Sequence, residues 1–84
     1  MVNAEKLRAA LSAIAKVLAR GEATHERDDF LRRSALYHIE RGERHLQKFR
    51  WGQFDGEDHL AHAAARILMA LEVKEQTTRQ EDAR

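Results

Sequence analysis

The sequence has 84 residues and contains neither cysteine nor proline. Without cysteine the chain cannot form disulfides, hold a metal through thiolates or use a thiol nucleophile. Proline breaks helices and glycine weakens them, so a chain with no proline and only four glycines favours a mostly helical fold. These absences predict a small all-α domain in a reducing compartment such as the cytoplasm.

Two further absences bear on partners. No apolar stretch approaches the roughly 20 residues that a membrane helix needs, and residues 1–8 lack the apolar core of a signal peptide. Fifteen basic and fourteen acidic residues leave a net charge of +1, and no helix-turn-helix pattern is present, which disfavours nucleic acid as a ligand. The sequence therefore predicts a protein that binds neither membranes nor nucleic acid.

Apolar residues recur at helical spacing in three segments, which predict helices over residues 3–20, 29–50 and 57–75. Asn3 is placed to cap the start of the first helix, and Gly21 is placed to end it.

The domain formed by these helices spans residues 1–75, and residues 76–84 form a polar tail without periodicity, which we expect to be disordered. Three helices of this length offer few large apolar side chains, so a monomer can build only a thin core. The predicted fold is an all-α, three-helix bundle completed by homo-oligomerisation, as a homodimer or homotetramer.

The second predicted helix carries polar and small residues close to its inward face. His38 and His45 lie seven residues, or about two turns, apart, with Gly42 between them. A glycine inside a helix costs about 1 kcal/mol relative to alanine, so Gly42 indicates close approach of another helix or of a ligand.

Titratable side chains gather at the junction of the second and third predicted helices. His59 and His62 are three residues apart, so their rings can converge on one ligand, and His45 can approach from the preceding helix. Together with Asp55 or Asp58 they supply enough donors for a transition metal. The alternative is that these histidines only form hydrogen bonds across a polar helix junction.

Other side chains near this cluster suit a phosphate substrate. Glu40 and Glu43 form an i, i+3 pair that can hold Mg²⁺, although such pairs also balance arginines on solvated helix faces. Arg44 and Arg66 are candidates for phosphate contact because each lies near a histidine. Trp51 could stack on a nucleobase or could cover the helix junction.

Across these motifs the chain resembles a known family. The residues that carry the resemblance are Arg44-His45-Leu46, Gly52, Asp55, His59-Leu60-Ala61-His62-Ala63-Ala64 and, further along the same helix, Leu71-Glu72. The pattern is similar to that of small, all-helical, MazG-like dATP/dGTP diphosphohydrolase-type domains of phages and bacteria, and it covers roughly residues 13–73.

The resemblance implies an enzyme, or a degenerate relative of one, that hydrolyses a deoxynucleoside triphosphate to the monophosphate and pyrophosphate, with Mg²⁺ or Mn²⁺ as cofactor. It also implies action in the cytoplasm, which is the host cytoplasm if the protein is phage-encoded. The implied roles are metal binding for Glu43, Asp55 and Asp58, water activation or phosphate contact for His45, His59 and His62, and substrate binding for Arg44, Arg66 and Trp51.

A second hypothesis comes from a different class of protein. A short helical chain of this kind could be a non-catalytic oligomerisation or partner-binding module. The two hypotheses differ in metal dependence, because only the hydrolase has a reason to gain thermal stability from magnesium or manganese.

Overall fold

The computed structural model describes residues 2–24, 29–53 and 55–82. These residues form three α-helices, α1 (Arg8–Thr24), α2 (Ala35–Arg50) and α3 (His59–Asp82), and no strand occurs among them. Two short 3-10 helices, η1 (Ala4–Leu7) and η2 (Asp29–Arg32), precede α1 and α2. The all-α prediction is confirmed.

The first helical segment begins where the sequence predicts and ends later. The Asn3 side chain accepts a hydrogen bond from the backbone N–H of Lys6 at 3.2 Å and so caps the N-terminus of η1. Gly21 was expected to end the helix, but α1 continues to Thr24. A helix-ending glycine adopts a positive φ, and among the described glycines only Gly52 and Gly56 do so.

The second helix begins six residues later than predicted, at Ala35 rather than at residue 29. The Ser34 hydroxyl accepts a hydrogen bond from the backbone N–H of Tyr37 at 3.1 Å, which makes it the N-cap. The residues before it form η2 instead. At the other end Gly52 adopts φ 67° directly after the C-cap residue Trp51, and this turns the chain out of the helix.

The third helix begins at His59, because the Asp58 carboxylate accepts a hydrogen bond from the backbone N–H of Ala61 at 3.0 Å. The prediction of a disordered tail is wrong for residues 76–82, which continue α3. Side-chain bonds of i, i+4 spacing support this stretch, including Gln76 Nε2 to Glu72 Oε2 at 2.8 Å. Residues 83–84 lie outside the described part of the chain.

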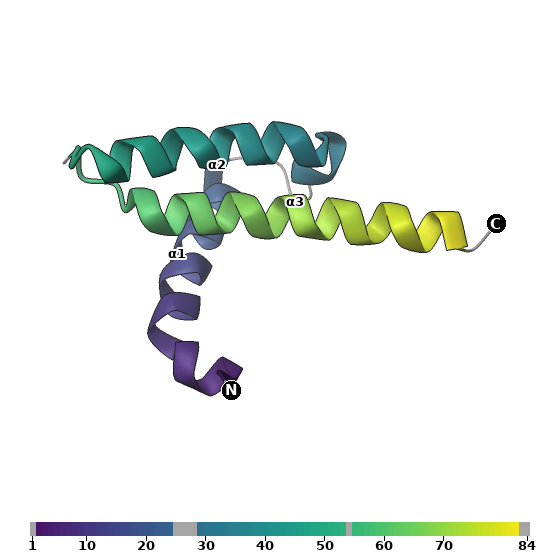
Figure 1. Cartoon of the computed structure of the whole chain (residues 1–84), viewed down its shortest axis with the longest axis horizontal. Helices are drawn as coiled ribbons and strands as arrows, with labels where there is room; N and C mark the ends of the chain where they lie inside the picture. The colour runs from purple at the N-terminus through teal and green to yellow at the C-terminus, as the bar shows by residue number, and fades with distance from the viewer. Residues whose placement is uncertain (1, 25–28, 54, 83–84) are drawn as a thin grey trace.

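Helices α2 and α3 run side by side in opposite directions (Figure 1). Three facing pairs define their register: His38 with Arg66, Gly42 with Ala63, and His45 with His59. A Cβ atom added at Gly42 would lie 3.4 Å from the Ala63 carbonyl oxygen, so another helix approaches closely here, as the glycine predicted, but leaves room for a methyl group at contact distance.

Helix α1 projects away from the α2–α3 pair (Figure 1), and among the described residues it packs against α3 and not α2. The buried apolar residues are small, namely Ala61, Ala63, Ala65 and Ala70. Larger apolar side chains of α3 stay on the surface, with exposed fractions between 42 and 49%. No helix in the described ranges has the length and apolar character to cross a membrane.

Candidate functional site

The end of α2 and the start of α3 bring three histidines together. The Nδ1 atoms of His45 and His59 are 3.0 Å apart, and the ring of His62 stacks on that of His45 with a centroid distance of 4.8 Å. His59 is 3% exposed, whereas His45 and His62 are half-buried. The predicted approach of His45 to His59 is present, whereas His62, expected to share a ligand with His59, stacks on His45 and lies outside the group of donor atoms.

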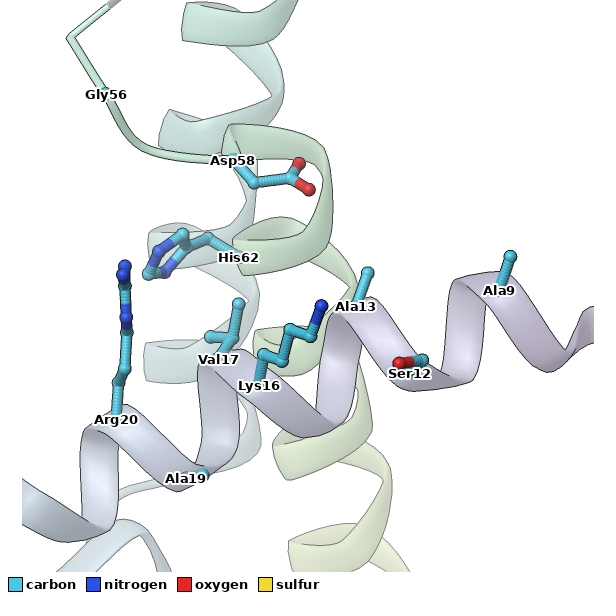
Figure 2. Close-up of a pocket in the computed structure, with 10 residues that line it drawn as sticks. All are labelled: Ala9, Ser12, Ala13, Lys16, Val17, Ala19, Arg20, Gly56, Asp58 and His62. Atoms are coloured by element: carbon cyan, nitrogen blue, oxygen red, sulfur yellow. The ribbon is translucent and has the colours of Figure 1, made fainter.

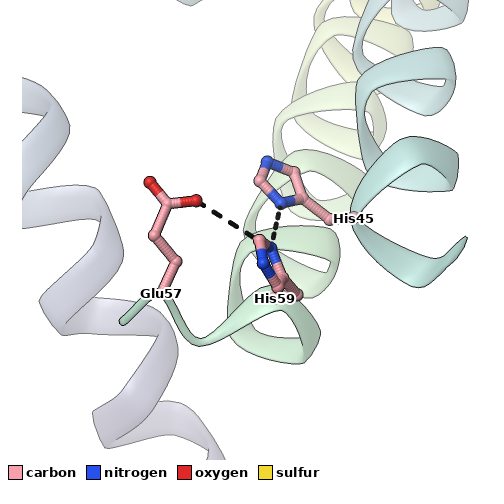
Figure 3. A group of neighbouring side chains, drawn as sticks. All are labelled: His45, Glu57 and His59. Atoms are coloured by element: carbon pink, nitrogen blue, oxygen red, sulfur yellow. Dashed lines mark hydrogen bonds and ion pairs between the residues drawn. The ribbon is translucent and has the colours of Figure 1, made fainter. Parts of the chain in front are cut away.

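A carboxylate completes the group. Figure 3 shows the Glu57 side chain directed from the segment before α3 toward the two imidazoles, and its Oε2 lies 3.9 Å from His59 Nδ1. One donor atom from each of His45, Glu57 and His59 lies within 4.8 Å of the other two. These residues form a candidate metal site.

The spacing of the two histidine donors suits a single ion, whereas the Glu57 carboxylate, at 3.9 Å from His59 Nδ1, would have to move closer to join them. Two ligands bound at 2.0–2.1 Å, with an angle of roughly 90–110° at the metal, lie about 2.8 to 3.4 Å apart, and the two Nδ1 atoms are 3.0 Å apart. One of these nitrogens must carry the proton that the other accepts. An ion would displace that proton, because imidazole binds metals through a free lone pair.

Asp55 supports the ring of His59 from its other side. Its Oδ1 lies 2.9 Å from His59 Nε2 as a close polar contact that is not aligned as a hydrogen bond. The same oxygen accepts a hydrogen bond from the backbone N–H of Glu57 at 3.2 Å. That backbone hydrogen bond is the main cause that lowers the pKa of Asp55, and His59 contributes to the lowering. A carboxylate behind a ligating imidazole orients the ring and raises its basicity. Asp55 is thus placed as a support for a metal ligand.

Burial lowers the pKa of His45, and the neighbouring His62 and His59 rings lower it further. A lowered pKa keeps the His45 imidazole neutral at pH values where an ordinary histidine begins to take up a proton. Neutral imidazole is the form that binds a metal.

The other residues proposed from the sequence do not join this group. Glu43 and Arg44 are exposed on α2 outside the metal group, and Trp51 is 75% exposed after it. Arg66 donates to Nδ1 of the buried His38 at 3.2 Å, and burial lowers its pKa. Asp58, besides capping α3, lines the pocket described next.

A pocket of about 670 Å³ lies between α1 and the start of α3 (Figure 2). Its polar lining includes Lys16 and Arg20 from α1, with Asp58 and His62 opposite. Residues on either side of Glu57 also line it, so the pocket adjoins the metal group. The sequence did not identify Glu57 as a candidate metal ligand, nor Lys16 and Arg20 as residues of a pocket.

Comparison with known proteins places the chain in a family. No curated protein and no solved structure matches it. A family model described as dATP/dGTP diphosphohydrolase, N-terminal, matches residues 6–84, which is nearly the whole chain and includes the residues of the histidine cluster and the pocket. The resemblance read from the sequence is confirmed: the chain belongs to the dATP/dGTP diphosphohydrolase N-terminal family.

Proposed function

We propose that this domain is a metal-dependent deoxynucleoside triphosphate pyrophosphohydrolase that acts in the cytoplasm. The observation that carries the proposal is the convergence of His45, Glu57 and His59 donor atoms within 4.8 Å beside a pocket large enough for a nucleotide. The family description, which names dATP and dGTP, supports the choice of substrate.

The reaction joins water to the α-phosphorus of the nucleotide. The water oxygen bonds to that phosphorus, and the bond from it to the oxygen bridging to the β-phosphorus breaks. The products are the monophosphate and pyrophosphate, and the water proton must be accepted by a base. A bound divalent ion would neutralise phosphate charge and lower the pKa of a bound water. We propose His62 as the base that accepts this proton, because it lines the pocket and lies outside the metal group.

The donor set favours one of the two ions expected from the sequence. Mg²⁺ prefers oxygen ligands in strict octahedral geometry, whereas Mn²⁺ shares the preference for carboxylates but, as a transition metal, also accepts imidazole nitrogens. Two imidazoles with one carboxylate therefore fit Mn²⁺ better than Mg²⁺. We propose Mn²⁺ as the activating ion.

We further propose that the domain works as a homodimer or homotetramer. Leu60, Ile67 and Leu71 of α3 are 47 to 49% exposed, and with Ala64 they recur at spacings of four, three and four residues. That repeat is the pattern by which one helix packs against another. A second copy of α3 would cover it and complete a four-helix core. Sedimentation equilibrium should give a multiple of the 9.7 kDa chain mass.

The test is pyrophosphate release from dATP, dGTP, dCTP and dTTP, with Mn²⁺, Mg²⁺ or EDTA. We expect release in Mn²⁺, none in EDTA, and a loss of at least tenfold in Glu57→Gln because a metal ligand is removed. Glu81→Gln is the matched control, since Glu81 is exposed near the end of α3, far from the cluster, and should retain full activity. Equal activity in both variants would contradict the proposed metal site.

The alternative function is a non-catalytic oligomerisation or partner-binding module. The exposed apolar side chains of η1, α1 and α3, including Leu7 and Leu11, favour this alternative. It predicts a folded protein that releases no pyrophosphate from any nucleotide and gains no thermal stability from a divalent ion.

A further inference from the structure

We infer that the pocket between α1 and the start of α3 binds the polyphosphate chain of the nucleotide, an inference that rests on the proposed function for the identity of its ligand. Neither the sequence motifs nor the family match assigns a role to this pocket. Its cationic side chains, its position beside the metal group and its size support the assignment.

The charged side chains that line the pocket favour an anionic ligand. Lys16 and Arg20 are four residues apart on α1, so they project from the same face of the helix. Figure 2 shows Arg20 extending from α1 toward His62, whereas the Lys16 side chain extends along the same face of α1 in the direction of Ala13. Among the described residues that line the pocket, Asp58 is the one with a carboxylate, and its Oδ1 already accepts a hydrogen bond from the backbone N–H of Ala61 at 3.0 Å. The two cations thus outnumber the acidic group, as an anionic ligand requires.

The pocket adjoins the metal group of His45, Glu57 and His59. Gly56 and Asp58 line the pocket, and Glu57 lies between them in the chain. His62 also lines the pocket, and its ring stacks on the metal-group residue His45 with an interplanar angle of 18°. A phosphate chain in this pocket would therefore lie beside His62, whose ring stacks on a residue of the metal group.

The volume of the pocket and its apolar lining residues also suit a nucleotide. A volume of about 670 Å³ falls within the 300–1,000 Å³ typical of small-molecule sites. Ala13 and Val17 give the pocket an apolar wall on α1, which suits the uncharged part of a nucleotide.

The alternative cations fit a phosphate chain less well. Arg66 donates to His38 at 3.2 Å and is half-buried between α2 and α3. Arg44 is exposed on α2 and lines neither the pocket nor the metal group. The described residues thus offer Lys16 and Arg20 as the cations that share a cavity with a histidine of the cluster.

Inorganic tripolyphosphate is the probe for this inference. Titration calorimetry should show binding to the wild-type chain, with affinity about tenfold weaker in Lys16→Gln, the effect of losing one charge-assisted hydrogen bond. Lys74→Gln is the matched control, because Lys74 lies twelve residues beyond His62, about 18 Å along α3, and should bind as the wild type does. Backbone amide NMR shifts should change at Val17 and His62.

Each other outcome overturns the inference. These outcomes are no binding of tripolyphosphate, equal weakening in both lysine variants, or shifts that cluster on α2 around Arg44. The result is separable from the proposed function, since tripolyphosphate binding does not require turnover. If the wild type hydrolyses nucleotides and Lys16→Gln leaves KM unchanged, the pocket assignment fails while the activity stands.

Discussion

Replacement of His38 by alanine should be the most destabilising change at the α2–α3 interface. The His38 side chain is fully buried, with 0% exposure. Its Nε2 lies 2.9 Å from the Phe30 carbonyl oxygen, and its Nδ1 lies 3.2 Å from Arg66 Nη1. With Nε2–H donating to the carbonyl and Nδ1 accepting from the guanidinium, the ring joins η2, α2 and α3 in a single tautomer.

The magnitude follows from these contacts. A buried hydrogen bond contributes about 1 kcal/mol, one to a charged group about 1.5–3 kcal/mol, and loss of the ring leaves a cavity. We expect His38→Ala to lower the free energy of unfolding by about 3 kcal/mol, out of roughly 4–13 kcal/mol for a domain of this length. At about 4–8 °C per kcal/mol, Tm should fall by roughly 12–24 °C.

Far-UV circular dichroism melts in EDTA measure this change without a contribution from bound metal. Glu40→Ala is the control on the same helix, because Glu40 is exposed, and it should stay within about 0.5 kcal/mol of the wild type. His38→Gln keeps a donor for the Phe30 carbonyl and should lose less than alanine. If His38→Ala melts at the same temperature as Glu40→Ala, the buried hydrogen bonds do not hold the three elements together.

Three further predictions concern the same interface and the metal group. Gly42→Ala should raise Tm, because alanine favours the helix by about 1 kcal/mol and the new Cβ would contact Ala63 and Arg66 atoms at 3.4 Å, whereas the larger side chain of Gly42→Leu should lower Tm. A lower Tm for both variants would mean that α2 and α3 are too close together to accept even a methyl group. The pKa of His45 is lowered in the folded protein, so below the ordinary histidine value of 6.5 the unfolded chain takes up the proton before the folded one does. The free energy of unfolding of the metal-free protein should therefore decrease as pH falls through 6.5. Urea titrations should show a smaller decrease in His45→Asn. Asp55→Asn should weaken Mn²⁺ binding about 10–100-fold in calorimetry while the ligands remain, and unchanged affinity would remove its supporting role.

The sequence was sufficient to predict the middle of each helix but not most of the ends. Apolar periodicity placed α1, α2 and α3 because burial of one face fixes the helical register. The ends depend on competition among local caps: Ser34 took the N-cap of α2, and Gly21 kept a helical conformation inside α1. The C-terminal extension of α3 depends on i, i+4 side-chain bonds such as Glu72–Gln76, which composition alone underrates.

The site was predictable in the same partial way. The positions of His45, His59 and His62 were enough to predict three imidazoles at this helix junction, but not that His62 would stack on His45 instead of sharing a ligand with His59. The role of Glu57 was not predictable, because it depends on the path of the turn between α2 and α3, where Gly52 and Gly56 take φ values of 67° and 87°.

The pocket cations on α1 were hidden for a different reason. The angle at which α1 crosses α3 determines that Lys16 and Arg20 face His62. That angle is a property of tertiary packing and leaves no trace in local periodicity.

The central claim is that His45, Glu57 and His59 hold a divalent ion, and anomalous diffraction from crystals grown with Mn²⁺ tests it most directly. The account predicts one peak per chain, bonded to Nδ1 of both histidines and to the Glu57 carboxylate. A peak at Glu43 or Asp58 instead, or no peak at the histidine cluster, would contradict it.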